Sequence, residues 1–230
     1  MNRPIVGARW HDASMHDLGS ISTFWDAAAG SFDQEADHGL RDSRVRAAWA
    51  NRLRSWMPAA PARILDLGCG TGSVSLLLAE HGHIPVGVDL SPRMIKIAQD
   101  KMNRQGRHVP LLVGDAGNPP SQVGDSFDVV LTRHLLWTLP DPHAALRRWT
   151  RLIRPGGRLI LIEGRWGTST DDAPYTTQTP PLPWNGGVTA EHLSDAVRPL
   201  VRDLRTESLD EPDLWGRPID DERYALIADI

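Results

Sequence analysis

Short apolar runs and amphipathic stretches alternate along most of this chain. The runs have the length and composition of buried parallel strands, and the stretches between them place apolar residues at helical spacing. The predicted strands are residues 64–67, 84–88, 109–113, 127–132, 158–163, 201–209 and 223–229. The predicted helices between them are residues 73–80, 91–102, 142–152 and 189–200. This alternation predicts an α/β chain built around a mostly parallel sheet.

The part of the chain before the first strand is predicted to be helical. Residues 22–58 read as two helices joined near Gly30 and Gly39, with Pro58 closing the second. The residues of the second helix that should face the sheet are Val45, Ala48, Trp49, Leu53 and Trp56. Residues 1–20 show no clear periodicity, and we expect part of them to be mobile.

A glycine-rich turn follows the first strand. Asp66 stands two positions before the sequence Gly-Cys-Gly-Thr-Gly of residues 68–72, and the second strand ends on Asp89. Glycines let the backbone turn sharply and let a ligand approach closely. An acid at the tip of the second strand of a βαβ unit can accept both hydroxyls of a ribose. The unit therefore predicts a nucleoside site.

The spacing of the turn distinguishes two kinds of nucleoside. Dinucleotide sites carry three glycines as GxGxxG, with a helix N-terminus directed at a pyrophosphate. Here the spacing is GxGxG, and Asp66 would repel a pyrophosphate but favour an ammonium group. The ligand indicated is a nucleoside with a cationic tail, although glycines that only pack a helix on a strand remain an alternative.

The sequence ILDLGCGTG, followed by VGVDLSPRMIKIA, resembles the class I S-adenosylmethionine-dependent methyltransferases, particularly the group that acts on small molecules. The resemblance is strong over residues 64–161 and weak in the flanks. It implies a Rossmann-like, seven-stranded, mostly parallel sheet with helices on both faces and an antiparallel last strand. It also implies an N-terminal helical lid, residues 1–57, before a methyltransferase core, residues 58–230.

The same resemblance implies a set of cofactor-binding residues. The acid and turn after the first strand would hold the methionine part, Asp89 the ribose, and the residues around Met94 and Asp115 the adenine. An aromatic lid residue, Phe32, would cover the cofactor or pack in the core. The complete set is Phe32, Asp66, Gly68, Cys69, Gly70, Gly72, Asp89, Leu90, Met94, Asp115, Ala116 and Thr132.

Subclasses of the family differ most after the fourth strand, in the stretch Arg133-His134-Leu135-Leu136-Trp137. Enzymes that methylate adenine or glutamine nitrogen carry [ND]PP[YFW] there, whereas this chain has only Asn-Pro-Pro-Ser at residues 118–121, after the third strand. Residues 132–140 lack the glutamate pair of arginine methyltransferases. Cys69, inside the glycine turn, is unsuited to be the nucleophile of a cytosine enzyme. All three substrate classes are disfavoured.

Two side chains of this stretch are the candidate catalytic residues. His134 is the first choice for a general base that accepts a proton from the nucleophile, with His38 second; alternatively, His134 hydrogen-bonds the backbone or stacks on the cofactor. Arg133 either holds an anionic or carbonyl oxygen of the substrate or pairs with an acid of the chain. Direct displacement from a sulfonium needs no metal, and we expect none.

Nine tryptophans against three phenylalanines and two tyrosines favour a flat aromatic or heteroaromatic substrate. Candidate substrate residues, each also readable as a core or surface residue, are Trp25, His38, Arg41, Trp137 and Trp166. Residues 164–187, rich in Gly, Thr and Pro, are predicted to form a substrate-side flap. The sequence also resembles actinobacterial tailoring enzymes, which suggests specialised metabolism such as antibiotic biosynthesis.

Composition restricts the partners. The 230 residues suffice for one full core, and the net charge of −4 gives no reason to expect nucleic acid. One cysteine and the absence of a signal pattern or long apolar run indicate a cytoplasmic protein without a membrane partner. We expect a monomer or homodimer that binds a small molecule. A protein of the same fold that uses S-adenosylmethionine for another reaction, or only binds it, and a nicotinamide oxidoreductase remain alternatives.

Overall fold

The computed structural model describes residues 10–166 and 182–230, with side chains from residue 18 onward. Seven strands form one sheet in the order β3-β2-β1-β4-β5-β7-β6. The strands are β1 Arg63–Leu67, β2 Ile84–Asp89, β3 Leu111–Val113, β4 Phe127–Arg133, β5 Ile153–Arg165, β6 Asp203–Ser208 and β7 Glu222–Asp229. β7 runs antiparallel to β5 and β6, while β1 to β5 pair in parallel. The predicted sheet, with its antiparallel last strand, is confirmed.

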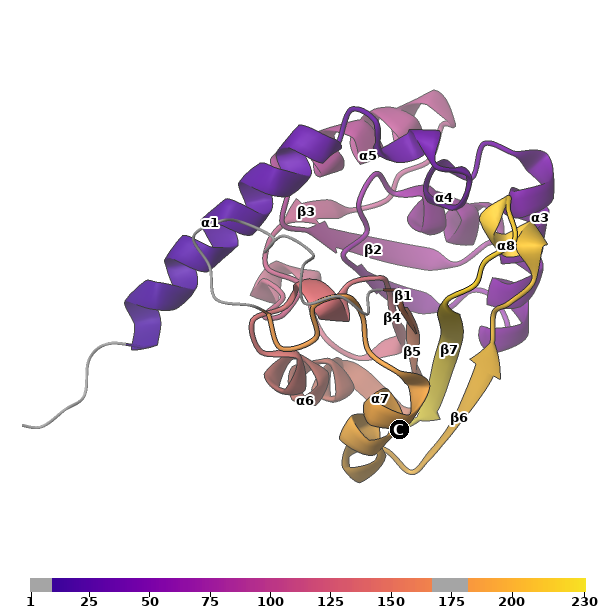
Figure 1. The fold of residues 1–230 in the computed structure, drawn as a ribbon. Coiled ribbons are helices and arrows are strands. Elements are labelled where there is room, and N and C mark those ends of the chain that lie inside the picture. Colours follow the sequence, from indigo (N-terminus) through magenta and orange to yellow (C-terminus); the bar gives the residue numbers. More distant parts are fainter. Residues whose placement is uncertain (1–9, 167–181) are drawn as a thin grey trace, which may run out of the picture.

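Helices cover both faces of this sheet, and α1 extends along its edge (Figure 1). The α-helices are α1 Trp10–Ala28, α2 Ala36–Gly39, α3 Ser43–Trp56, α4 Ser73–Glu80, α5 Pro92–Arg104, α6 Pro142–Leu152, α7 Ala190–Val197 and α8 Pro212–Trp215. Short 3-10 helices are η1 Phe32–Gln34, η2 Ser121–Val123, η3 Leu136–Thr138 and η4 Arg198–Leu200. Among the described helices, none is both long and apolar enough to cross a membrane.

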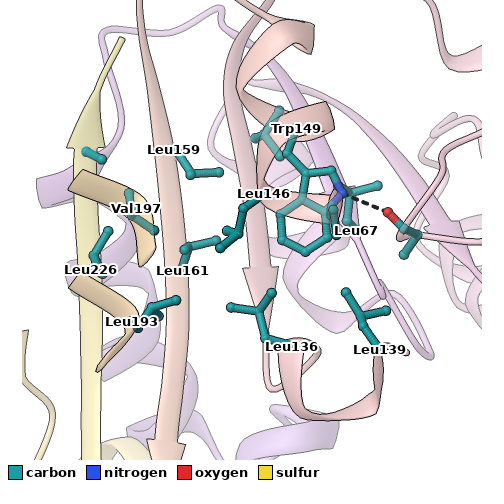
Figure 2. Packing of buried hydrophobic residues seen from close by; sticks show 14 of the residues in the cluster. Leu67, Leu136, Leu139, Leu146, Trp149, Leu159, Leu161, Leu193, Val197 and Leu226 are labelled. Carbon is teal, nitrogen blue, oxygen red and sulfur yellow. Dashed lines mark hydrogen bonds between the residues drawn. The ribbon is translucent and has the colours of Figure 1, made fainter. Parts of the chain in front are cut away.

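The face of the sheet covered by α6 and α7 packs around Trp149. This side chain of α6 is fully buried, and its indole Nε1 donates a hydrogen bond of 2.8 Å to the carbonyl oxygen of Ala116 (Figure 2). Leu161 of β5, Leu136 of η3 and Leu193 of α7 lie in the same cluster. The hydrogen bond satisfies the one polar group of the indole and joins α6 to the loop after β3. That loop is thereby fixed at the carboxyl edge of the sheet.

The other face packs against α3, α4 and α8. Trp49 and Trp56 of α3 are fully buried, and Trp49 donates from Nε1 to the carbonyl oxygen of Leu214 at 2.7 Å. They share a cluster with Leu131 of β4 and Ile162 of β5. The prediction that this helix faces the sheet is confirmed, so α3 forms a layer of the core.

Four features of the elements differ from the sequence predictions. β5 runs from Ile153 to Arg165, so it begins five residues earlier than predicted. The first helix begins at Trp10 rather than near Ser22, and Leu18 and Ile21, before Ser22, lie at helical spacing from Trp25. β3 begins at Leu111, two residues later than predicted. The one-turn helix α8 was not predicted, because four residues give too short a pattern for periodicity to reveal. Of the predicted flap, 164–187, the central residues 167–181 lie outside the described part of the chain.

Candidate active site

A cavity of about 260 Å³ lies where the parallel strands end. In an open α/β sheet this carboxyl edge is the usual place for a ligand. The lining residues come from α1, η1 and α2, from the ends of β1 to β4 and the turns after them, and from the ends of β5 and β7. They are Leu18, Ile21, Trp25, Phe32, His38, Gly68, Gly70, Asp89, Leu90, Met94, Asp115, Ala116, Arg133, His134, Leu135, Trp137, Thr138, Leu139, Trp166 and Arg223.

The turn between β1 and α4 brings backbone, without side chains, to the cavity wall. Gly68 and Gly70 have φ angles of 69° and 53°, a region that disfavours other residues. A Cβ on Gly68 would lie 2.8 Å from Leu135 Cδ1, and one on Gly70 would lie 3.4 Å from Phe32 Cε1. Glycine is therefore required both by conformation and by the close approach of the post-β4 loop and the lid.

Asp89, at the tip of β2, is held by backbone amides. Its Oδ2 accepts from the amide of Gly70 at 2.8 Å, and its Oδ1 accepts from the amide of Ser91 at 2.9 Å. Burial raises the pKa of this carboxyl, although the two amides oppose the rise. Since each carboxylate oxygen can accept more than one hydrogen bond, Asp89 keeps the capacity to bind two further hydroxyls.

Asp66 lies beneath the cavity rather than in its wall. Only 2% of the residue is exposed, and the hydroxyl of Ser75 donates to its Oδ2 at 2.5 Å. Burial raises its pKa to about 6, against the opposing effects of Ser75 and the Arg133 charge. In its ionised form Asp66 acts on the cavity through its electrostatic field.

Three residues after β2 and β3 form an apolar wall with one acid beside it. Leu90 and Met94 enter from the start of α5, and Ala116 from the loop after β3. Asp115 adds a carboxylate, whose Oδ1 accepts from the amide of Gly117 at 2.7 Å. Such a wall is suited to a flat ring with one hydrogen-bond donor on its edge.

The helix α1 is attached to the start of α5. The Asp26 carboxylate accepts from the hydroxyl of Ser91 and, at 3.0 Å, from the amide of Arg93. The hydroxyl of Ser22 donates to the carbonyl oxygen of Leu90 at 3.1 Å. These contacts place the apolar face of α1 over the cavity.

A second polar contact joins η1 to the glycine turn. Asp33 accepts from the hydroxyl of Thr71 at 2.5 Å and lies 3.0 Å from the ammonium group of Lys101. This ion pair is largely buried, with side-chain exposures of 11% and 13%. The ion pair holds the preceding residue, Phe32, in place. The Phe32 ring stacks on the His38 ring, with centroids 4.2 Å apart.

Aromatic rings that contact one another form a stretch of the cavity wall, which we call the aromatic half. Trp137 lies between Trp25 and Trp166, with ring centroids at 6.4 Å and 5.9 Å and nearly perpendicular planes. Trp166 in turn lies 5.0 Å from the His134 ring. This aromatic half is large, flat-sided and weakly polar, which suits an aromatic ligand.

His134 occupies a strained position at the end of β4. Its φ is 55°, and its amide donates to the carbonyl oxygen of Ile162 at 2.8 Å. The ring atom Nε2 is buried and has no hydrogen-bond partner among the described residues. Burial, followed by the charges of Arg133 and Arg223, lowers the pKa well below the usual value, so the imidazole is neutral at pH 7.

Glu163, which the sequence analysis did not identify, supports the post-β4 loop. It is fully buried on β5, and its Oε1 accepts from the amides of Leu135 and Leu136, each at 2.9 Å. Burial raises its pKa to about 7. The sequence signal that could have identified Glu163 is its place as an acid in an otherwise apolar strand.

The structure brings together most of the predicted site residues. In the cavity wall are Trp25, Phe32, His38, Gly68, Gly70, Asp89, Leu90, Met94, Asp115, Ala116, Arg133, His134, Trp137 and Trp166. Outside it are Arg41, Asp66, Cys69, Gly72 and Thr132. The side chain of Arg41 is 72% exposed and lies 3.6 Å from Asp33, whereas Thr132 is fully buried. The sequence analysis missed Leu18, Ile21, Leu135, Thr138, Leu139 and Arg223 in this wall.

The residues present fit a nucleoside with a cationic tail. The glycine turn offers backbone without a Cβ, Asp89 offers acceptors for a ribose, and Leu90, Met94 and Asp115 suit an adenine. The field of Asp66 favours a positive charge near the turn. In the part of the chain that the structure describes, no group of three or more His, Cys, Asp or Glu side chains is arranged to hold a metal ion.

Comparisons with known proteins match the central part of the chain to methyltransferases. Residues 65–161 match the family model described as Methyltransferase domain. The ubiquinone biosynthesis O-methyltransferase of Xanthomonas axonopodis pv. citri is 29% identical over 160 residues, which span 70% of this chain and 64% of that protein.

Solved structures share the fold at low sequence identity. Magnesium protoporphyrin IX methyltransferase from Synechocystis PCC 6803 has a TM-score of 0.63 at 17% identity, over 98% of this chain and 99% of its own. The 4+2 cyclase SpnF has a TM-score of 0.64 at 20% identity, over 94% of each chain. With the domain match, the sheet order and the antiparallel β7, the resemblance seen in the sequence is confirmed. Residues 65–161 thus match a methyltransferase domain, and the chain has the fold of the class I S-adenosylmethionine-dependent methyltransferases.

Proposed function

We propose that this protein transfers a methyl group from S-adenosylmethionine to an O, N or C nucleophile of a small aromatic or heteroaromatic metabolite, without a metal. One observation carries the proposal: the glycine turn and Asp89 share a single cavity with a wall of three tryptophans. A nucleoside in the first half would therefore lie next to a ring in the second. A role in specialised metabolism is part of the proposal.

In this mechanism the chain mainly positions and encloses the reactants. The cofactor supplies an electrophilic methyl group on a sulfonium. Gly68, Gly70 and Asp89 hold the nucleoside, while Trp25, Trp137 and Trp166 orient the acceptor ring. The N-terminal segment, residues 1–57, acts as a lid through α1 and Phe32, which exclude water from the displacement.

His134 is the proposed proton acceptor. Its Nε2 has no partner within the described chain, and the imidazole is neutral, so it can accept a hydrogen bond from the nucleophile. A pKa held this low makes a free imidazole a weak base. His134 therefore works best on a nucleophile that is already acidic, such as a phenol.

The first test is calorimetric titration of the purified chain with S-adenosylmethionine and S-adenosylhomocysteine, with NADH as control. We expect both sulfur nucleosides to bind and NADH to give no heat. Transfer of label from methyl-labelled S-adenosylmethionine to a panel of phenols and N-heteroaromatics is then scored by mass spectrometry. His134→Ala should reduce turnover at least tenfold and change S-adenosylhomocysteine affinity less than threefold.

Binding without transfer would favour the second candidate, a protein of this fold that uses the nucleoside for another reaction. That candidate is kept because the fold accommodates a cyclase as well as methyltransferases. Binding of NADH alone would refute the cofactor assignment. Unchanged turnover in His134→Ala would return His134 to a packing role.

A further inference from the structure

The cavity contains a guanidinium without a counter-ion among the described residues. Arg133, at the end of β4, lines the cavity, and its Nη1 is buried without a hydrogen-bond partner. One face of the guanidinium lies on the Trp49 ring, with Cζ 5.0 Å from the centroid. The charges of Asp37 and Asp66 act on it, but neither carboxylate is close enough to form an ion pair.

The other arginine of the cavity has a different environment. Arg223 forms a forked contact with Asp221, Nε to Oδ1 at 2.6 Å and Nη2 to Oδ2 at 2.7 Å. Its charge is therefore balanced within the chain. His38 and His134, the two histidines of the cavity wall, have pKa values lowered by burial and are neutral at pH 7. Of the two arginines in the described part of the cavity wall, Arg133 is therefore the one without an ion pair; the wall also contains the carboxylates of Asp89 and Asp115.

A buried cation without a partner is unfavourable, because it has lost its hydration and gained no anion in return. Burial accordingly lowers the pKa of Arg133. An arginine fork matches the two oxygens of a carboxylate, and a single charge balances one carboxylate better than a phosphate dianion. Both His38 Nδ1 and His134 Nε2 are buried without partners near this charge.

We propose that Arg133 binds the carboxylate of a molecule held in the cavity, with the Trp49 ring behind the guanidinium and His38 and His134 beside it. This inference rests on the proposed function. It makes Arg133 a binding residue and adds a negative charge to the chemistry of the ligand.

The bound carboxylate has a further consequence for His134. After burial, the charges of Arg133 and then Arg223 contribute most to the low pKa of this imidazole. A carboxylate on Arg133 offsets the larger of these two effects. His134 then becomes a stronger proton acceptor when the ligand is in place.

Two molecules could supply the carboxylate: the substrate, or the methionine tail of the cofactor. Asp66 pairs in register with Leu131, and Arg133 is two residues further along β4, so both charged side chains project from the same face of the sheet. An amino-acid tail has a matching order of charges, ammonium near Asp66 and carboxylate at Arg133. An aromatic acid in the tryptophan half would reach the same guanidinium.

Calorimetry on the wild type and on Arg133→Met separates these sources. The cofactor arm compares S-adenosylhomocysteine with its decarboxylated analogue, 5′-deoxy-5′-(3-aminopropylthio)adenosine, which keeps the ammonium group. The substrate arm compares 4-hydroxybenzoate with phenol, both in the presence of S-adenosylhomocysteine. Affinity for the decarboxylated analogue also reports whether the variant is folded, and Arg133→Lys tests whether charge without the fork suffices.

A charge-assisted hydrogen bond corresponds to a preference for the carboxylate of about 10- to 100-fold. If the cofactor supplies it, this preference appears in the first arm of the wild type and falls below threefold in Arg133→Met. If the substrate supplies it, the same loss appears only in the second arm. Carboxylate preferences that survive in Arg133→Met, or that are absent from both arms of the wild type, overturn the inference. A wild type that binds neither nucleoside refutes the proposed function instead.

Discussion

The buried carboxyl of Glu163 should make the stability of this protein depend on pH in a specific direction. Its pKa is raised from 4.5 to about 7, chiefly by burial. One pKa unit corresponds to about 1.4 kcal/mol, so ionising this group in the folded protein costs about 3 kcal/mol more than in the unfolded chain. The group is fully buried, so solvent screening does not reduce this figure.

The sign follows from the order of the two pKa values. Below pH 4.5 Glu163 is protonated in both states and carries no penalty. As the pH rises to about 7, the unfolded chain releases its proton first, and the free energy of unfolding falls. Above pH 7 both states are ionised and the whole penalty is present.

The perturbation is Glu163→Gln, which keeps an oxygen to accept from the Leu135 and Leu136 amides and cannot ionise. The free energy of unfolding of each protein is measured by urea titration from pH 4.5 to pH 8. The difference, variant minus wild type, should become more positive by about 3 kcal/mol across this range. Subtraction removes the contributions of Asp66 and Asp89, because they are common to both proteins.

Glu191→Gln, at an exposed position of α7, controls for the loss of one negative charge from the surface. Its difference from the wild type should stay nearly constant with pH. A constant difference for Glu163→Gln as well would show that Glu163 is not held in its protonated form, and would refute the reasoning.

Three other predictions concern Asp89, the glycine turn and the attachment of α1. Asp89→Asn should weaken S-adenosylhomocysteine binding about 10- to 100-fold by calorimetry, because it loses a charged acceptor; equal affinity would contradict the ribose assignment. Gly72→Ala should reduce the free energy of unfolding by about 2 kcal/mol, since φ is 75° and the added Cβ would lie 2.9 Å from Ala98 Cβ. Gly106→Ala is the control: φ is 60° and the added Cβ would meet open space, so its smaller loss of stability should reflect backbone strain alone. Asp26→Ala should speed amide exchange in residues 18–28 of α1, as followed by mass spectrometry; unchanged protection would mean that apolar packing alone holds the helix.

The sequence could predict the sheet because its inner strands, such as β1, β4 and β7, are mostly buried and therefore read as apolar runs. The GxGxG turn could also be predicted, since Gly68 and Gly70 adopt positive φ angles and lie close to other side chains, and few other residues permit both. Asp89 could be placed because it follows a strand directly. These signals are local, and each is set by residues near one another in the chain.

The structure alone decided how distant segments meet. Trp25, Trp137 and Trp166 could each have been core residues, and only the tertiary arrangement brings α1, the post-β4 loop and the end of β5 around one cavity. Arg133 and Arg223 have the same side chain in the sequence, yet one is paired and one is not. The fold follows from the apolar periodicity, which is a property of the sequence itself. The charge balance of the site depends on which side chains lie within a few ångströms of one another, and that is a property of the packed structure.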